Sequence, residues 1–224
     1  MSATQLDESS VDVSDSVDGA GRTTKDSRRW GTGWLALAVV VGLLLGFAAG
    51  LLAPTLTRPG DDSPEAGFAR DMSTHHAQAV EMSVLAQEKA TDPRVRSLAV
   101  DIALTQQAQI GMMQTWLREW QLDPNGSQPR MAWMPGGEHM VENGLMPGMA
   151  TDEERERLRN ASGRDFDVLF LELMLKHHIG GIHMAEGVLE LSDDPEVRRL
   201  AQAMVNGQKK ETTLIQDLLS ELQQ

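Results

Sequence analysis

Two stretches decide the fold: FARDMSTHHAQAVEMS at residues 68–83 and FLELMLKHHIGGIHMA at residues 170–185. When the chain is shifted by 102 residues, the two stretches align without a gap, and an adjacent histidine pair in one meets a pair in the other. These pairs are His75–His76 and His177–His178. The alignment continues downstream to the ends of both segments. Two copies of this length indicate a duplicated helical hairpin.

Each copy predicts two helices joined by a short turn. The first helices are expected over about 64–90 and 165–191, and the second helices over about 93–121 and 195–222. Asp92 and Asp194 can cap the second helices, because each precedes a proline that suits the first helical position. Two such hairpins predict an all-α four-helix bundle. The join between them, about 122–164, is rich in Met, Gly and Pro and includes a short helix that begins near Thr151.

An apolar segment precedes the bundle. No charged residue lies between Arg29 and Arg58, and Trp34–Ala53 is long enough to cross a membrane as a helix. More basic residues precede this segment than follow it, which places the N-terminus in the cytoplasm and the bundle outside. We therefore expect a disordered cytoplasmic tail at 1–29, a transmembrane signal anchor at 30–57 and an extracytoplasmic domain at 58–224. A cleaved signal peptide and a buried soluble helix are the alternatives.

The composition excludes several classes of function. The chain of 224 residues has no cysteine, which excludes disulfides, Cys-ligated zinc, iron–sulfur clusters and thiol catalysis. Its net charge of −13 disfavours nucleic acid as a partner. No phosphate-binding glycine motif or nucleophile constellation is visible in it. Its 13 methionines and 6 histidines remain as candidate metal ligands.

Histidine and methionine share one face of each first helix. In both copies a methionine stands three residues before the histidine pair, and another follows it, at spacings that a helix brings to one side. The candidate ligands are Met72, His75, His76 and Met82 in the first copy and Met174, His177, His178, His183 and Met184 in the second. Core packing is the alternative, but buried imidazoles would each need a hydrogen-bond partner.

This ligand set predicts copper. Imidazole binds zinc, copper, nickel and iron, whereas thioether sulfur selects Cu(I). A di-iron site is disfavoured because no glutamate stands three residues before any histidine of the two pairs. Zinc and iron are not excluded by these residues alone. Methionine also suits an oxidising compartment, since it forms no disulfide.

The crossover carries further methionine and histidine. Met131, Met134, His139, Met140, Met146 and Met149 lie there, with His139 and Met140 as the candidate ligands. They can form a second Cu(I) site or a lid over the histidine face, and the alternative is that they are apolar plugs. For Met112 and Met113 on the preceding helix, core packing is favoured.

The two histidine segments resemble a known family. FARDMSTHHAQAVEMS, FDVLFLELMLKHHIGGIHMAEGVLEL and the preceding LMPGMATDEERERLRNASGRDFD are similar to the paired HH signatures of the bacterial domain-of-unknown-function family 305. The resemblance covers about residues 64–222. It implies a ferritin-like four-helix bundle, an exported or membrane-anchored location and, for some members, copper binding. Carried over by position, it implicates the same nine residues of the two first helices.

The sequence therefore predicts a membrane-anchored, extracytoplasmic protein that sequesters or delivers copper through its His/Met clusters, with Cu(I) as the favoured oxidation state. The alternative is a non-enzymatic interaction module with structural histidines that contacts a membrane partner. Catalysis by a metalloenzyme is ranked last, because Asp71, Glu81 and Glu172 are the only candidate bases near the histidines. A protein partner and the oligomeric state are left open by the sequence.

Overall fold

The computed structural model describes residues 31–56 and 58–224, and these residues are helical apart from their connections. The helices are α1 (Thr32–Leu56), α2 (Pro64–Lys89), α3 (Pro93–Glu119), α4 (Asp152–Asn160), α5 (Gly163–Leu191) and α6 (Pro195–Leu222), with a 3-10 helix η1 (Gly137–Met140). No strand occurs in this part of the chain, where Glu142 and Leu145 form an isolated bridge. The expected all-α fold is confirmed, and the helix bounds differ from the predicted ones by a few residues.

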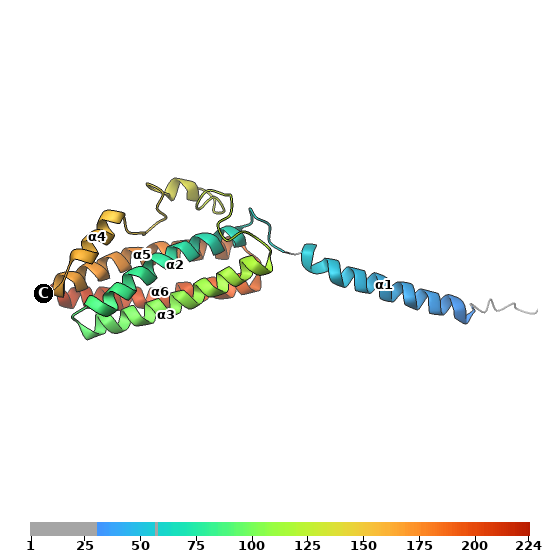
Figure 1. Cartoon of the computed structure of the whole chain (residues 1–224), viewed down its shortest axis with the longest axis horizontal. Helices are drawn as coiled ribbons and strands as arrows, with labels where there is room; N and C mark the ends of the chain where they lie inside the picture. The colour runs from blue at the N-terminus through green and yellow to red at the C-terminus, as the bar shows by residue number, and fades with distance from the viewer. Residues whose placement is uncertain (1–30, 57) are drawn as a thin grey trace, which may run out of the picture. The chain divides into compact units, whose positions relative to one another are not determined.

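Helices α2, α3, α5 and α6 form an antiparallel four-helix bundle (Figure 1). Helix α2 packs against α3 within the first hairpin, α5 packs against α6 within the second, and α2 meets α5 between them. The long crossover leaves the end of α3 and returns along the α2–α5 side to α4 and the start of α5 (Figure 1). The duplicated hairpin predicted from the repeat is therefore the unit from which the bundle is built.

The hairpin turns are made by the caps that the sequence predicts. Asp92 accepts a hydrogen bond from the backbone N–H of Arg94, and Asp194 accepts from those of Glu196 and Val197. Each cap satisfies donors that the first turn of a helix leaves unpaired. In α4, Thr151 and Glu154 form the predicted reciprocal capping box.

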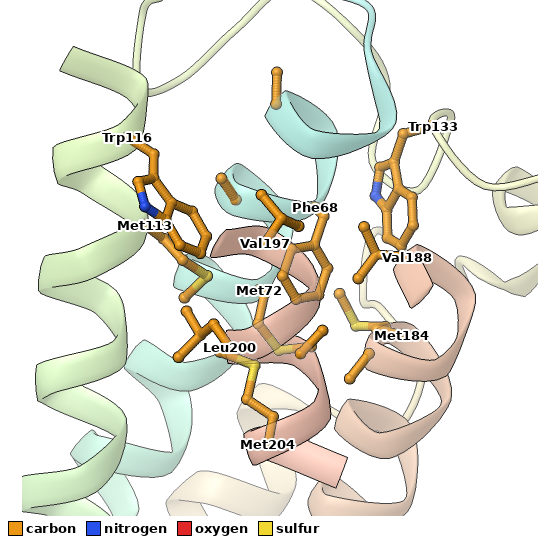
Figure 2. Packing of buried hydrophobic residues seen from close by; sticks show 14 of the residues in the cluster. Phe68, Met72, Met113, Trp116, Trp133, Met184, Val188, Val197, Leu200 and Met204 are labelled. Carbon is orange, nitrogen blue, oxygen red and sulfur yellow. The ribbon is translucent and has the colours of Figure 1, made fainter. Parts of the chain in front are cut away.

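The interior of the bundle has two apolar clusters. One includes Phe68, Met72, Met113, Met184 and Met204, and Figure 2 shows these side chains packed between the helices. The other includes Met82, Ile102, Phe170, Met174 and Ile215. Buried polar residues occupy the stretches between the two clusters on all four helices: His75, His76, Gln78, Gln106, His177, His178 and Gln208. The bundle therefore has a polar layer across its middle.

Helix α1 differs from the bundle helices because its side chains are exposed throughout residues 33–51. Leu43, Leu45 and Phe47 expose 65–69% of their surface. The segment Gly33–Leu51 is long and apolar enough to cross a membrane. The contacts divide the chain into one unit ending at Pro54 and another from Thr55 to Gln224. The predicted disordered tail at 1–29 lies outside the described residues.

Candidate metal centre

Four imidazoles lie at the centre of the polar layer. His75, His76 and His178 have no exposed surface, and His177 exposes 1% of its surface. The ring centroids of His75 and His177 are 3.8 Å apart, so the two first helices meet through these rings. We call His75 and His177 the inner imidazoles and His76 and His178 the outer ones. The ring centroid of each inner imidazole lies 6.4–6.5 Å from that of the outer one next to it in sequence. The structure thus brings together both histidine pairs predicted from the repeat.

The outer imidazoles each bind the second helix of their own hairpin. His76 Nε2 lies 2.7 Å from Gln109 Oε1 on α3. His178 Nε2 lies 2.7 Å from Glu211 Oε2 on α6. An amide oxygen and a carboxylate oxygen can only accept, so each Nε2 carries the proton and donates it.

The inner imidazoles donate to backbone carbonyls. His75 Nε2 donates to the carbonyl oxygen of Pro147 in the crossover at 3.0 Å. His177 Nε2 donates to the carbonyl oxygen of His75 itself at 2.9 Å. These two bonds link α2, α5 and the crossover at one point.

All four hydrogen bonds have the same consequence for the other ring nitrogen. Because Nε2 holds the proton, the Nδ1 atom of each neutral ring has a free lone pair. The Nδ1 atoms of His75, His76 and His178 are buried without a hydrogen-bond partner. Metal-ligating histidines usually donate their second N–H to a carbonyl or carboxylate in this way, which orients the ring and fixes its tautomer.

Burial favours the neutral form of His75, His76 and His177. Desolvation lowers the pKa of His75 to about 4, although its bond to Pro147 opposes the shift. Desolvation and the neighbouring His75 lower the pKa of His76 to about 3. The pKa of His177 is lowered well below its usual value by the same two causes. Neutral imidazole is the form that binds metal, so at neutral pH no proton must leave these rings first.

Methionines stand on both sides of the imidazole layer. Met72 and Met184 belong to the apolar cluster on one side. Met82 and Met174 belong to the cluster on the other side. All four are at least 98% buried. The predicted Met/His face of each first helix is thus an interior face.

The crossover covers the inner imidazoles. A Cβ atom on Gly180 would come within 1.9 Å of the Pro147 carbonyl oxygen, and one on Gly148 within 2.4 Å of the Lys176 carbonyl oxygen. Only glycine permits these approaches of the crossover to α5. Met146 and Met149 beside Pro147 are buried in the first apolar cluster, as is Met131. Pro147 thus lies against the ring of His75, while these three methionines pack into the core.

Three of the predicted ligands lie away from this layer. His183 and His139 are exposed, and Met140 is half-buried in the crossover. His183 lies on a different face of α5 from the buried Met184. The structure does not bring these three residues to the four imidazoles.

The candidate bases have structural partners. Asp71 accepts hydrogen bonds from the backbone N–H of Met131 and from Trp133 Nε1, which holds the crossover against α2. Burial raises the pKa of Asp71. Glu81 pairs with Arg155 and Arg159 on α4. Glu172 is exposed on α5.

Sequence reasoning missed the residues that orient the rings. Gln109 and Glu211 are 33 residues from the histidines that they bind, and nothing in the local pattern points to them. The repeat does contain a signal, because position 109 aligns with position 211 at the same offset of 102. It also aligns Gln106 with Gln208, whose Oε1 atoms are buried without partners in the same layer.

The donor set restricts which metal it fits. Across residues 31–56 and 58–224, no three His, Asp or Glu side chains converge on a single metal position. The unpaired acceptors in the layer are imidazole nitrogens and amide oxygens, and the neighbouring sulfurs are thioethers. A site made of one or two imidazoles and thioether sulfurs would contain fewer than three His, Asp or Glu side chains, so it would agree with this finding. This chemistry fits a soft monovalent ion better than a hard oxygen-liganded one.

Comparison with known proteins gives the chain's relatives. The family model described as "Domain of unknown function (DUF305)" matches residues 65–219. A DUF305 protein from Streptomyces coelicolor, described as secreted, is 47% identical with a TM-score of 0.67, covering 73% of this chain and 96% of that one. A DUF305 fragment from Deinococcus radiodurans is 32% identical with a TM-score of 0.59, over 70% and 96% of the two chains.

CopM has the same fold at lower identity. Its Cu(I)-bound form is 23% identical with a TM-score of 0.56, covering 71% of this chain and 96% of that one. The comparison with curated proteins found no match. The family model spans most of the bundle, and the Streptomyces relative shares nearly half of the aligned residues. The chain therefore belongs to the DUF305 family, as the paired HH segments predict.

Proposed function

We propose that this protein binds copper, mainly as Cu(I), outside the cytoplasmic membrane and sequesters or delivers it. One observation carries the proposal: all four buried imidazoles donate Nε2–H, and the Nδ1 lone pairs of His75, His76 and His178 are left without a partner in a layer bordered by methionines. Such lone pairs are costly to bury without a partner. A metal ion would satisfy them, and thioether neighbours favour Cu(I) among the candidates.

Two further observations support copper. CopM, which shares this fold, has solved structures in Cu(I)-, Cu(II)- and silver-bound forms. The four imidazoles of the present chain are buried, which disfavours the alternative in which they contact a membrane partner directly.

The location is part of the proposal. Helix α1 offers an apolar, exposed surface of membrane-spanning length over Gly33–Leu51. The basic residues Arg22, Lys25, Arg28 and Arg29 precede it, which favours a cytoplasmic N-terminus and a bundle on the outer side. Copper would then be held where cysteine ligands would oxidise.

The test is a titration of the full chain in detergent. Cu(I) is added anaerobically against a competing chelator, with Cu(II) and Zn(II) in parallel. We expect tight Cu(I) binding that disappears when His75, His76, His177 and His178 are all replaced by alanine. Copper affinity that is unchanged in this variant, while circular dichroism shows an intact helical fold, would overturn the site.

A methionine variant separates the two ligand types. Replacing Met72, Met82, Met174 and Met184 by leucine keeps the volume of the core nearly constant. We expect Cu(I) affinity to fall about 10–100-fold and Zn(II) affinity to change little, since thioether is a ligand for the softer ion. The matched control replaces Met113 and Met204 by leucine; these two methionines are buried in the same cluster as Met72 and Met184 but belong to the second helices, which carry no histidine. Equal losses in the variant and the control would contradict the role of the sulfurs.

A further inference from the structure

The polar layer is nearly identical in its two halves. The offset of 102 residues relates His75 to His177, His76 to His178 and Gln106 to Gln208. It also relates Gln109 to Glu211, and this pair alone differs in charge. Each half of the layer therefore has two imidazoles and one buried glutamine at equivalent positions. The halves differ at Gln78, which aligns with Gly180, and at Gln109, which aligns with the carboxylate of Glu211.

Gln109 and Glu211 have the same geometric role. Each side chain accepts the Nε2–H of its outer histidine at 2.7 Å. The side chain of Glu211 is 23% exposed, whereas that of His178 is fully buried. Among the described residues, His178 is the partner of the Glu211 carboxylate, while the nearby Lys209 pairs with Glu186 instead. The negative charge therefore acts on the imidazole ring.

A carboxylate and an amide affect a ligating imidazole differently. Both fix the tautomer, but the carboxylate also makes the ring a stronger electron donor and adds a negative charge one ring away from Nδ1. The Coulomb energy of an ion with this charge is proportional to the charge of the ion. A divalent ion is therefore stabilised about twice as much as a monovalent ion at the same place.

On this basis we propose that Glu211 is a positioning residue that makes the second repeat favour divalent copper, whereas Gln109 leaves the first repeat suited to Cu(I). This inference rests on the proposed copper binding. The two halves of the layer are thus unequal metal sites, and the protein can hold copper in either oxidation state.

The experiment moves the charge between equivalent positions. Full-length wild type, Glu211→Gln, Gln109→Glu and the double variant are titrated in detergent with Cu(II) and with Ag(I), a monovalent ion that is stable in air. Glutamine already accepts the histidine N–H at position 109 in the first repeat, so Glu211→Gln puts the same histidine–glutamine contact into the second repeat. Glu186→Gln is the control, because it removes an exposed carboxylate of α5 that pairs with Lys209.

We expect Glu211→Gln to weaken Cu(II) binding about 10–100-fold. Ag(I) binding should weaken only about 3–10-fold, because half the Coulomb energy corresponds to the square root of the fold-change in affinity. The double variant should recover the wild-type ratio of the two affinities, and Glu186→Gln should not change it. Equal changes for the two ions, or no recovery in the double variant, would overturn the role of Glu211 while copper binding stands. A wild type that binds neither ion would overturn both proposals.

Discussion

At the scale of single residues, the polar layer costs the fold stability. Each buried acceptor without a partner costs roughly 1–3 kcal/mol, and the Nδ1 atoms of His75, His76 and His178 are in this state. Apolar side chains at these positions would continue the two clusters into one. This cost to the metal-free protein is consistent with the proposed metal binding, in which an ion would satisfy the free acceptors.

The lowered pKa values predict an acid-sensitive metal-free protein. A histidine in the unfolded chain titrates near 6.5, while the folded pKa is about 4 for His75 and about 3 for His76. Between these values the unfolded chain binds more protons, so the free energy of unfolding decreases as the pH falls. We expect a loss of roughly 2 kcal/mol for each of the two residues between pH 7 and pH 5.

Urea unfolding of the metal-free protein at the two pH values measures this loss. His76→Gln should reduce the difference, because it removes one of the buried groups whose pKa is lowered. His139→Gln and His183→Gln are the controls, since both side chains are exposed and lie away from the polar layer. A stability that is the same at pH 5 and pH 7 would contradict neutral burial of the rings.

At the scale of elements, the crossover is part of the site. Its Pro147 carbonyl binds the ring of His75, and Gln78 on α2 exchanges two hydrogen bonds with the backbone of Ala150. Asp71 holds the other part of the segment through Met131 and Trp133. A long connection is thus fixed to the first helices by polar contacts on both sides of the imidazoles.

Gly180 tests this arrangement. In Gly180→Ala the new Cβ would lie 1.9 Å from the Pro147 oxygen and 2.5 Å from its carbonyl carbon, both backbone atoms that cannot rotate away. We expect a loss of about 1–3 kcal/mol in the free energy of unfolding, together with faster hydrogen exchange at residues 146–149.

Gly111→Ala is the matched control for this prediction. Gly111 lies within α3 with nothing within 4 Å of a new Cβ. Alanine there should stabilise the protein by up to about 1 kcal/mol, because it has the higher helix propensity. The same change in stability for both variants would show that the crossover does not press on α5.

At the scale of the whole molecule, the chain consists of an apolar helix and an acidic bundle. Helix α1 has 25 residues, which corresponds to about 37 Å at 1.5 Å per residue. The hydrocarbon core of a bilayer is about 30 Å thick, so the helix can span it with some tilt. The Streptomyces relative is described as secreted, which keeps cleavage of this segment as the competing outcome.

Fractionation decides between the two outcomes. We expect the full chain to stay in the membrane through alkaline carbonate extraction, and a variant without residues 30–57 to be released. In intact cells a C-terminal tag should be open to added protease, and an N-terminal tag should be protected. A mature chain whose N-terminal sequence begins after the apolar segment would contradict the anchor.

Several features of the fold could be predicted from the sequence alone. The repeat is visible when the sequence is compared with itself at an offset of 102 residues. The Asp-Pro caps and the spacing of Met and His on each first helix depend on neighbours within a few residues. Helix bounds and buried faces follow from such short-range interactions. For the same reason, the spacing along each first helix is sufficient to assign both histidine pairs to its inward face.

The partners of the rings were decided by the tertiary structure. His76 meets Gln109 and His178 meets Glu211 across two packed helices, and His75 meets a backbone carbonyl of the crossover. A backbone carbonyl has no signature in the sequence, and contacts over 33 or 72 residues depend on how the helices pack. Only that packing separates the buried imidazoles from the exposed His139 and His183, since hydrogen bonding and burial are properties of the assembled bundle.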